Sequence, residues 1–148
     1  MTVLAAIGER EGSDEIVSHA YELSTAYGEP LVVLHVVPEE DFQEHKASIE
    51  GIDEFQDISF TQGEESAARF AGLVIDRAVA DVDHDMVETR GRVGDPADML
   101  LAEAESIDPS YIVIGRKHRS PVGKAVFGST TQEILLNATH PVVTVMLE

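Results

Sequence analysis

Residues 31–37 read LVVLHVV, a run in which six of the seven side chains are apolar and four are valine. Pro30 and Pro38 stand directly before and after the run. This pattern predicts a short strand that is buried on both faces. Strands of that kind occur in parallel sheets, whose crossover connections are helices that cover both faces. The run therefore favours a fold of the α/β class.

The rest of the chain alternates between short apolar runs and longer segments with helical spacing. Ile16, Ala20, Leu23 and Tyr27 recur at steps of three or four residues, as on one face of a helix, and Gly28 ends the pattern. Residues 39–62 are acidic and weakly periodic, and we expect an excursion there that could include a short helix. The expected strands cover residues 2–7, 31–37, 86–92, 111–114 and 142–146, and the expected helices cover 13–27, about 63–80, 96–106 and 128–138.

This order of elements predicts a single Rossmann-like domain over residues 1–148, with three α/β/α layers and a five-stranded parallel sheet. Asp95 and Pro96 follow the third expected strand and suit the N-cap and the first position of a helix. In such sheets, ligands bind beyond the carboxyl ends of the strands, at the point where the strand order reverses.

The charge balance restricts the partners of this chain. It carries 28 acidic and 10 basic residues, a net charge of −18, and this composition resembles that of proteins from halophilic archaea. Because an acidic surface repels nucleic acids and anionic membranes, we expect neither as a partner.

The chain has no cysteine, which excludes disulfides and thiolate metal sites. The N-terminus lacks the pattern of a signal peptide, and no apolar run approaches the roughly 20 residues of a membrane span, so we expect a cytoplasmic protein.

Residues 109–132 contain no acidic residue, yet they hold four of the ten basic residues. These are Arg116, Lys117, Arg119 and Lys124. A local charge of about +4 on so acidic a chain indicates a site for an anion. The segment also follows an expected strand, contains glycines at 115, 123 and 128, and ends where a helix begins. Helix N-termini offer unpaired N–H groups and a partial positive charge to a phosphate.

The start of that last helix allows two interpretations. Ser129 or Thr130 could cap the helix, with Gln132 and Glu133 completing a capping box. The same hydroxyls could instead bond a phosphate oxygen. In the alternative without an anion, the glycines only form turns, the hydroxyls only cap the helix, and the bases contact a partner subunit.

Common catalytic and cofactor-binding motifs are missing from the sequence. Gly123-Lys124 is followed by Ala125, so the Ser or Thr of the phosphate loop G-x-x-x-x-G-K-[ST] is absent. There is no G-x-G-x-x-G and no G-x-S-x-G, which argues against a dinucleotide site and against an α/β-hydrolase. The six histidines lack metal-binding spacing, and His35 fits a core residue. Asp95 and Asp98 fit a cap and a solvated helix face, so we expect no metal site and no catalytic residues.

Gly115-Arg116-Lys117-His118, followed by nine residues and then Gly128-Ser129, resembles the signature G-x-x-G-x9-G-[ST] of the universal stress protein family. The opening strand, the LVVLHVV run, the GDPAD helix start and the closing PVVTV run are similar to that family too, so the resemblance covers the whole chain. Two positions depart from the family pattern. His118 replaces the second signature glycine, and Gly8 stands where an acidic residue usually ends the first strand.

The resemblance implies that the chain binds an adenine nucleotide, ATP or AMP, with or without Mg²⁺. It implies a role in stress response or signalling with little or no catalysis, although weak ATP hydrolysis stays open. In nucleotide-binding members, the adenosine end lies against the tips of the first two strands, and the glycine turns wrap the phosphates. The implied site residues are Ala6, Ile7, Gly8, Val36, Ile114, Gly115, Lys117, His118, Gly128, Ser129 and Thr130.

Two other functions compete with nucleotide binding. The chain could be a dimeric stress-response interaction protein of the same fold that acts without nucleotide. A phosphohydrolase or transferase is less well supported, because no base, nucleophile or set of metal-binding carboxylates converges on the basic segment in the sequence.

Residues 142–146 form an apolar strand without charge, and similar proteins pair there. Since an exposed apolar edge strand is usually covered, we expect a homodimer through this strand.

Overall fold

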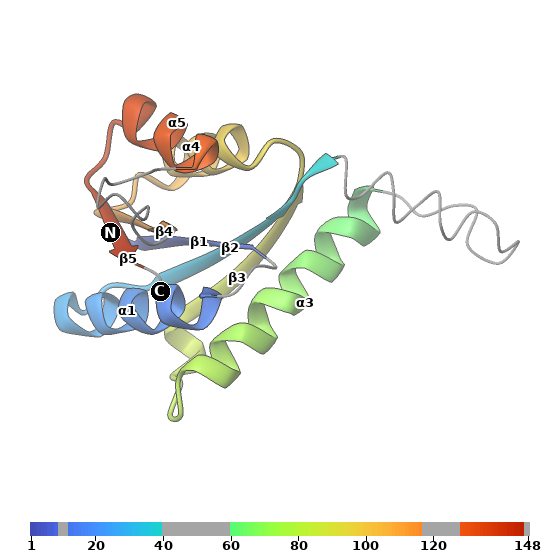
Figure 1. Ribbon diagram of the computed structural model, residues 1–148. Coiled ribbons are helices and arrows are strands. Elements are labelled where there is room, and N and C mark those ends of the chain that lie inside the picture. Colours follow the sequence, from blue (N-terminus) through green and yellow to red (C-terminus); the bar gives the residue numbers. More distant parts are fainter. Residues whose placement is uncertain (9–11, 40–59, 117–127, 147–148) are drawn as a thin grey trace, which may run out of the picture.

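The computed structural model describes residues 1–8, 12–39, 60–116 and 128–146, with the side chains of 60–62 and 116 excepted. These residues form a five-stranded sheet with helices on both faces, which confirms the expected α/β class (Figure 1). The strands are β1 (Val3–Ile7), β2 (Leu31–Val37), β3 (Val87–Val93), β4 (Tyr111–Arg116) and β5 (Val142–Met146). The helices are α1 (Ser13–Tyr27), α3 (Phe60–Ala78), α4 (Pro96–Ile107) and α5 (Ser129–Asn137), and η2 (His84–Met86) is a 3-10 turn. Within the described ranges, no helix is long and apolar enough to cross a membrane.

The strand order is β3-β2-β1-β4-β5, and every neighbouring pair is parallel. The central strand β1 pairs with β2 on one side, from Val3↔Leu31 to Ile7↔His35. On its other side β1 pairs with β4, beginning at Val3↔Tyr111. The chain therefore runs outward from β1 through β2 to β3 and then crosses to β4. The strand order reverses between β1 and β4.

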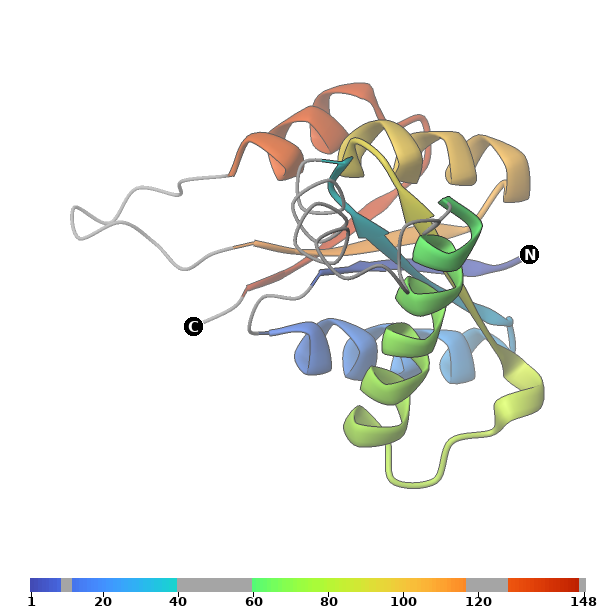
Figure 2. The ribbon, with the colours of Figure 1, turned by 90° about the vertical axis from the view of Figure 1, so that its right-hand side faces the viewer.

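Alternating strand residues divide the core into two clusters, one on each face of the sheet. Val3, Ala5 and Ile7 of β1 pack with buried residues of α1 and α3. Leu4 of β1 and Ile112 of β4 pack with buried residues of α4 and α5 on the other face. Figure 2 shows the two helical layers on opposite sides of the sheet. The LVVLHVV run is buried from its first residue to its sixth, as a strand covered on both faces should be.

Some element boundaries differ from those expected. The helix α3 begins at Phe60 instead of about residue 63. β3 begins at Val87 because η2 occupies the preceding residues, and Asp83 caps that turn by accepting a bond from the Asp85 N–H at 3.1 Å. β4 continues beyond residue 114 because β5 pairs with it as far as Arg116↔Met146. Most of the excursion expected at 39–62 lies outside the described residues.

The helix α4 is fixed at both its start and its middle. Asp95 is its N-cap, as expected, and its carboxylate accepts a bond from the Asp98 N–H at 3.0 Å. The Glu103 side chain is only 8% exposed and lies 2.8 Å from Arg90 and 2.7 Å from Arg92. These ion pairs join α4 to the edge strand β3.

Candidate functional site

The carboxyl ends of β1 and β4 flank the point where the strand order reverses. In open parallel sheets, ligands bind in the crevice outside such a point. Gly8 follows β1, Gly115 lies near the end of β4, and α5 begins at Ser129. The carboxyl ends of both strands and the start of α5 lie on the same side of the molecule, at the left of Figure 2. The topology therefore gathers these segments at one edge.

The predicted residues on the strands differ in their exposure. The partly exposed positions are Ala6, Gly8 and Gly115. The buried positions are Ile7, Val36 and Ile114, which are 6%, 6% and 3% exposed. Because these buried side chains belong to the two core clusters, a ligand could reach those positions only from the strand ends. Lys117 and His118 lie outside the described residues.

The start of α5 differs from the sequence-based prediction. Gly128, not Ser129 or Thr130, occupies the N-cap, in an extended conformation with φ −64° and ψ 160°. Ser129 and Thr130 are the first two helical residues, and a hydroxyl already inside the helix does not fold back over the N-terminal amides as an N-cap hydroxyl does. Gly128 has no side chain that could cap them either, so no side-chain cap forms among the residues that the structure describes. Within the described ranges, the exposed start of α5 therefore offers its first N–H groups without a side-chain cap, and such groups can bind an anion.

On each side of the reversal point, a hydroxyl group bonds a strand end to the start of a helix. The Thr131 hydroxyl donates a hydrogen bond to the carbonyl oxygen of Gly115 at 3.3 Å and joins α5 to the end of β4. The Ser13 hydroxyl donates one to the carbonyl oxygen of Gly8 at 2.6 Å and joins α1 to the tip of β1. The sequence did not single out Thr131 or Ser13 for these bonds, because both depend on approaches between different elements.

Two of the site glycines, Gly8 and Gly128, have open space around them among the described residues. A Cβ added to Gly8 or to Gly128 would meet none of the described atoms within 4 Å. The backbone of Gly128 also lies in a region that every residue type adopts. A side chain at 128 would therefore extend into open space at the start of α5.

Three exposed carboxylates meet beside the start of α5. The side chains of Asp95, Asp98 and Glu133 have oxygen atoms within 4.8 Å of one another. Glu133 is far from the other two in sequence, so its approach was not foreseen. Asp95 is also engaged as the N-cap of α4, as noted above.

The histidines that the structure describes are dispersed. His35 is 2% exposed, its Nδ1 lies 3.2 Å from the carbonyl oxygen of Ala67, and its ring lies 4.6 Å from that of Phe70, which confirms it as a core residue. His84 and His140 each contact an aspartate on the surface.

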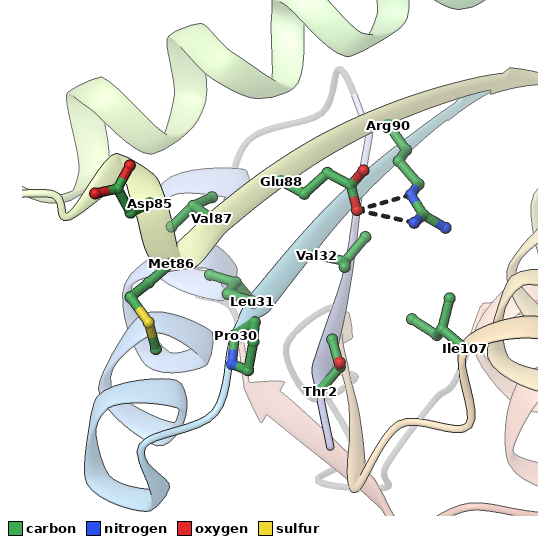
Figure 3. A pocket seen from close by; sticks show the side chains of 10 residues that line it. All are labelled: Thr2, Pro30, Leu31, Val32, Asp85, Met86, Val87, Glu88, Arg90 and Ile107. Carbon is green, nitrogen blue, oxygen red and sulfur yellow. Dashed lines mark hydrogen bonds and ion pairs between the residues drawn. The ribbon is translucent and has the colours of Figure 1, made fainter.

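A separate cavity of about 190 Å³ lies at the opposite, amino end of β1, β2 and β3 (Figure 3). Leu31 and Val32 form part of its wall, and Arg90 at its rim is paired with Glu88 at 2.8 Å. None of the predicted site residues that the structure describes lines this cavity.

A comparison with protein families matches residues 1–146 to the universal stress protein family. The chain belongs to the universal stress protein family. A universal stress protein of Mycolicibacterium smegmatis is 44% identical over 59 residues, which make up 39% of this chain and 45% of that relative's length.

Solved universal stress proteins share the fold of this chain at low sequence identity. The universal stress protein from Archaeoglobus fulgidus in complex with dAMP has a TM-score of 0.59 and 19% identity, with 97% of this chain and 96% of that chain covered. A universal stress protein in complex with cAMP has a TM-score of 0.64 and 18% identity, with 100% and 98% covered. In both of these proteins the bound molecule is an adenine nucleotide.

The universal stress protein signature has described residues at both of its ends. Gly115 begins it, and Gly128 with Ser129 ends it. In this structure, Gly115 accepts a bond from Thr131, which lies in the same first turn of α5 as Ser129, beside the reversal point. The first described residue of the signature is therefore bonded to the helical turn that begins at its last residue.

Proposed function

We propose that this universal stress protein binds an adenine nucleotide, ATP or AMP, at the carboxyl ends of β1, β2 and β4. The observation that carries the proposal is the exposed start of α5, which has a glycine N-cap and lies beside the reversal of strand order. Uncapped N–H groups and the positive end of the helix dipole together attract phosphate. Related folds that hold dAMP and cAMP support adenine as the base.

The charge of the adjacent sequence supports a phosphate ligand. Residues 109–132 have no acidic residue and include four bases, of which Lys117 lies within the signature. Charge-assisted bonds from such bases add to the helix N–H groups. The glycine at position 8 removes the acidic contact usual at the tip of the first strand, so we propose that phosphate contacts dominate the affinity. Mg²⁺ would accompany ATP as its counterion.

We propose that the bound nucleotide serves stress response or signalling and is turned over slowly or not at all. The residues proposed for the site are glycines, aliphatic residues, hydroxyl groups and bases, which suit binding better than catalysis. A steady-state assay of phosphate release with ATP tests this part of the proposal.

We also propose a homodimer that pairs through β5. This strand lies at the edge of the sheet, and together with α1 it lines a groove of about 620 Å³. The groove is lined by Val143, Thr144, Val145 and Met146 of β5 and by His19, Glu22, Leu23 and Ala26 of α1. A second copy is the occupant that fits, because an uncharged edge strand can pair with itself about a two-fold axis.

The acidic composition suggests a halophilic, cytoplasmic protein without nucleic-acid or membrane partners. A net charge of −18 keeps a protein soluble at high salt and repels polyanions.

Analysis of the purified protein for nucleotide released on denaturation tests the binding proposal. Stoichiometric release of an adenine nucleotide, or binding when the nucleotide is added back, supports it. If no nucleotide is released and none binds, the alternative of a nucleotide-independent dimeric interaction protein replaces it.

A further inference from the structure

We infer that Thr131 is a positioning residue that holds the phosphate-binding end of the nucleotide site in place. The inference rests on the proposed function. Its basis is the partly buried hydrogen bond of 3.3 Å from the Thr131 hydroxyl to the carbonyl oxygen of Gly115, which lies 16 positions earlier in the chain. The bond connects the first turn of α5 directly to the end of β4.

Within the described ranges, few side-chain hydrogen bonds fix the first turn of α5. Gly128 has no side chain to cap the helix, and Ser129 and Thr130 are exposed. Ile134 is the buried residue of the helix, and it lies beyond the first turn. Among the described residues, the Thr131 hydroxyl thus makes the side-chain hydrogen bond that links the first turn to the sheet.

A phosphate that binds the N–H groups of this turn requires the turn to stand at a defined distance from β4. When only a fraction of the molecules has the turn in that position, the apparent affinity falls in proportion to that fraction. One neutral hydrogen bond is worth roughly a three- to tenfold change in such an equilibrium. The adenosine end of the ligand, at the tips of β1 and β2, does not depend on this turn.

The inference therefore separates phosphate affinity from nucleoside affinity. Thr131→Val keeps the shape of the side chain and removes the donor, while Thr131→Ser keeps the donor. We expect Thr131→Val to bind AMP roughly three- to tenfold more weakly than the wild type and to bind adenosine equally well. Thr131→Ser should bind AMP within about twofold of the wild type, since its hydroxyl can make the same bond.

A matched control is available in α1, far from the site. Thr25 is also a helical threonine, and its exposed hydroxyl bonds the carbonyl oxygens of Tyr21 and Glu22 at 3.1 and 3.0 Å. Thr25→Val should leave the affinities for AMP and adenosine unchanged. Thermal melting of each variant shows that the compared proteins are folded.

Titration calorimetry of AMP and adenosine against these four proteins decides the inference. It is overturned if Thr131→Val binds AMP as tightly as the wild type, or loses AMP and adenosine affinity equally. Failure of Thr131→Ser to restore binding also overturns it. If the wild type binds neither molecule, the proposed function itself fails and the inference falls with it, which is a distinct result.

Discussion

Gly91 of β3 lies so close to α3 that a Cβ added to it would come within 2.0 Å of the carbonyl oxygen of Glu64. The same atom would come within 2.6 Å of the Ala68 backbone nitrogen. Both contacts are with backbone, so no side-chain rotation could relieve them. Gly91→Ala should therefore lower the free energy of unfolding by about 3 kcal/mol, near the upper end for overpacking, as measured by denaturant unfolding.

Gly72 provides the matched control on α3 itself. A Cβ at this helical position would meet none of the described atoms within 4 Å. Gly72→Ala should raise the free energy of unfolding by about 0.5–1 kcal/mol, because alanine loses less conformational entropy in a helix. Equal stability of the Gly91→Ala variant and the wild type would show that α3 does not pack this closely.

Patterns within single segments predicted most of the fold. The LVVLHVV run, Gly28 at the end of α1 and Asp95 at the start of α4 act locally, and each has the predicted role. The candidate site was less predictable. The bond from Thr131 to Gly115 and the approach of Glu133 to Asp95 depend on how separate elements pack, which periodicity does not report.

The difference between local patterns and packing between elements also explains why the predicted end of β4 and the predicted cap of α5 were wrong. β4 extends beyond its apolar core because its register with β5 supplies partners as far as Arg116, which the hydropathy of β4 alone does not reveal. The cap of α5 is Gly128, since the helix begins one residue earlier than a cap at Ser129 would require and two residues earlier than a cap at Thr130 would. Lys117 and His118 remain predictions from the sequence.

Tyr111 should titrate later than an ordinary tyrosine. Its ring stacks on that of Tyr27 with centroids 5.6 Å apart. A hydrogen bond with Tyr27 is the main cause that raises the pKa of Tyr111 above its usual 10.0, with lesser contributions from the charge of Tyr27, desolvation and the charge of Glu29. Because the raised pKa favours the neutral form, its stabilising effect is present below about pH 10 and is lost as the pH rises through the folded-state pKa.

The phenolate absorbance of the folded protein during an alkaline titration checks this prediction. Tyr27→Phe should lower the apparent pKa of the late transition. Tyr21→Phe is the control. The Tyr21 hydroxyl accepts a hydrogen bond from the Asp83 N–H, so its removal should leave the bond between Tyr27 and Tyr111 in place. An unchanged late transition in Tyr27→Phe would refute the assignment.

The net charge of −18 should make stability depend on salt. At low ionic strength the carboxylates repel one another over long distances, since the Debye length reaches roughly 30 Å at 0.01 M. The melting temperature should therefore rise steeply as KCl is added from the millimolar to the molar range. A flat response in differential scanning calorimetry would mean that the acidity has no halophilic role.

The proposed dimer predicts the effect of a charge on β5. Met146 is 48% exposed on the edge strand, so Met146→Lys would bring like charges together across the two-fold axis. Light scattering at micromolar concentration and high salt should report a dimer for the wild type and a monomer for this variant. Leu73→Lys, at a 67% exposed position of α3, should remain a dimer. A monomeric wild type would contradict the proposal.

The most direct test of the nucleotide site is titration calorimetry of ATP and AMP against the wild type and Gly128→Val. Since a side chain at 128 fits the described fold but would occupy the approach to the N–H groups of α5, we predict binding by the wild type and none by the variant. Lys117→Ala should weaken binding roughly tenfold or more, and His118→Gly should bind equally well or better. Equal binding by the wild type and Gly128→Val, or no binding by either at millimolar nucleotide, would contradict the account.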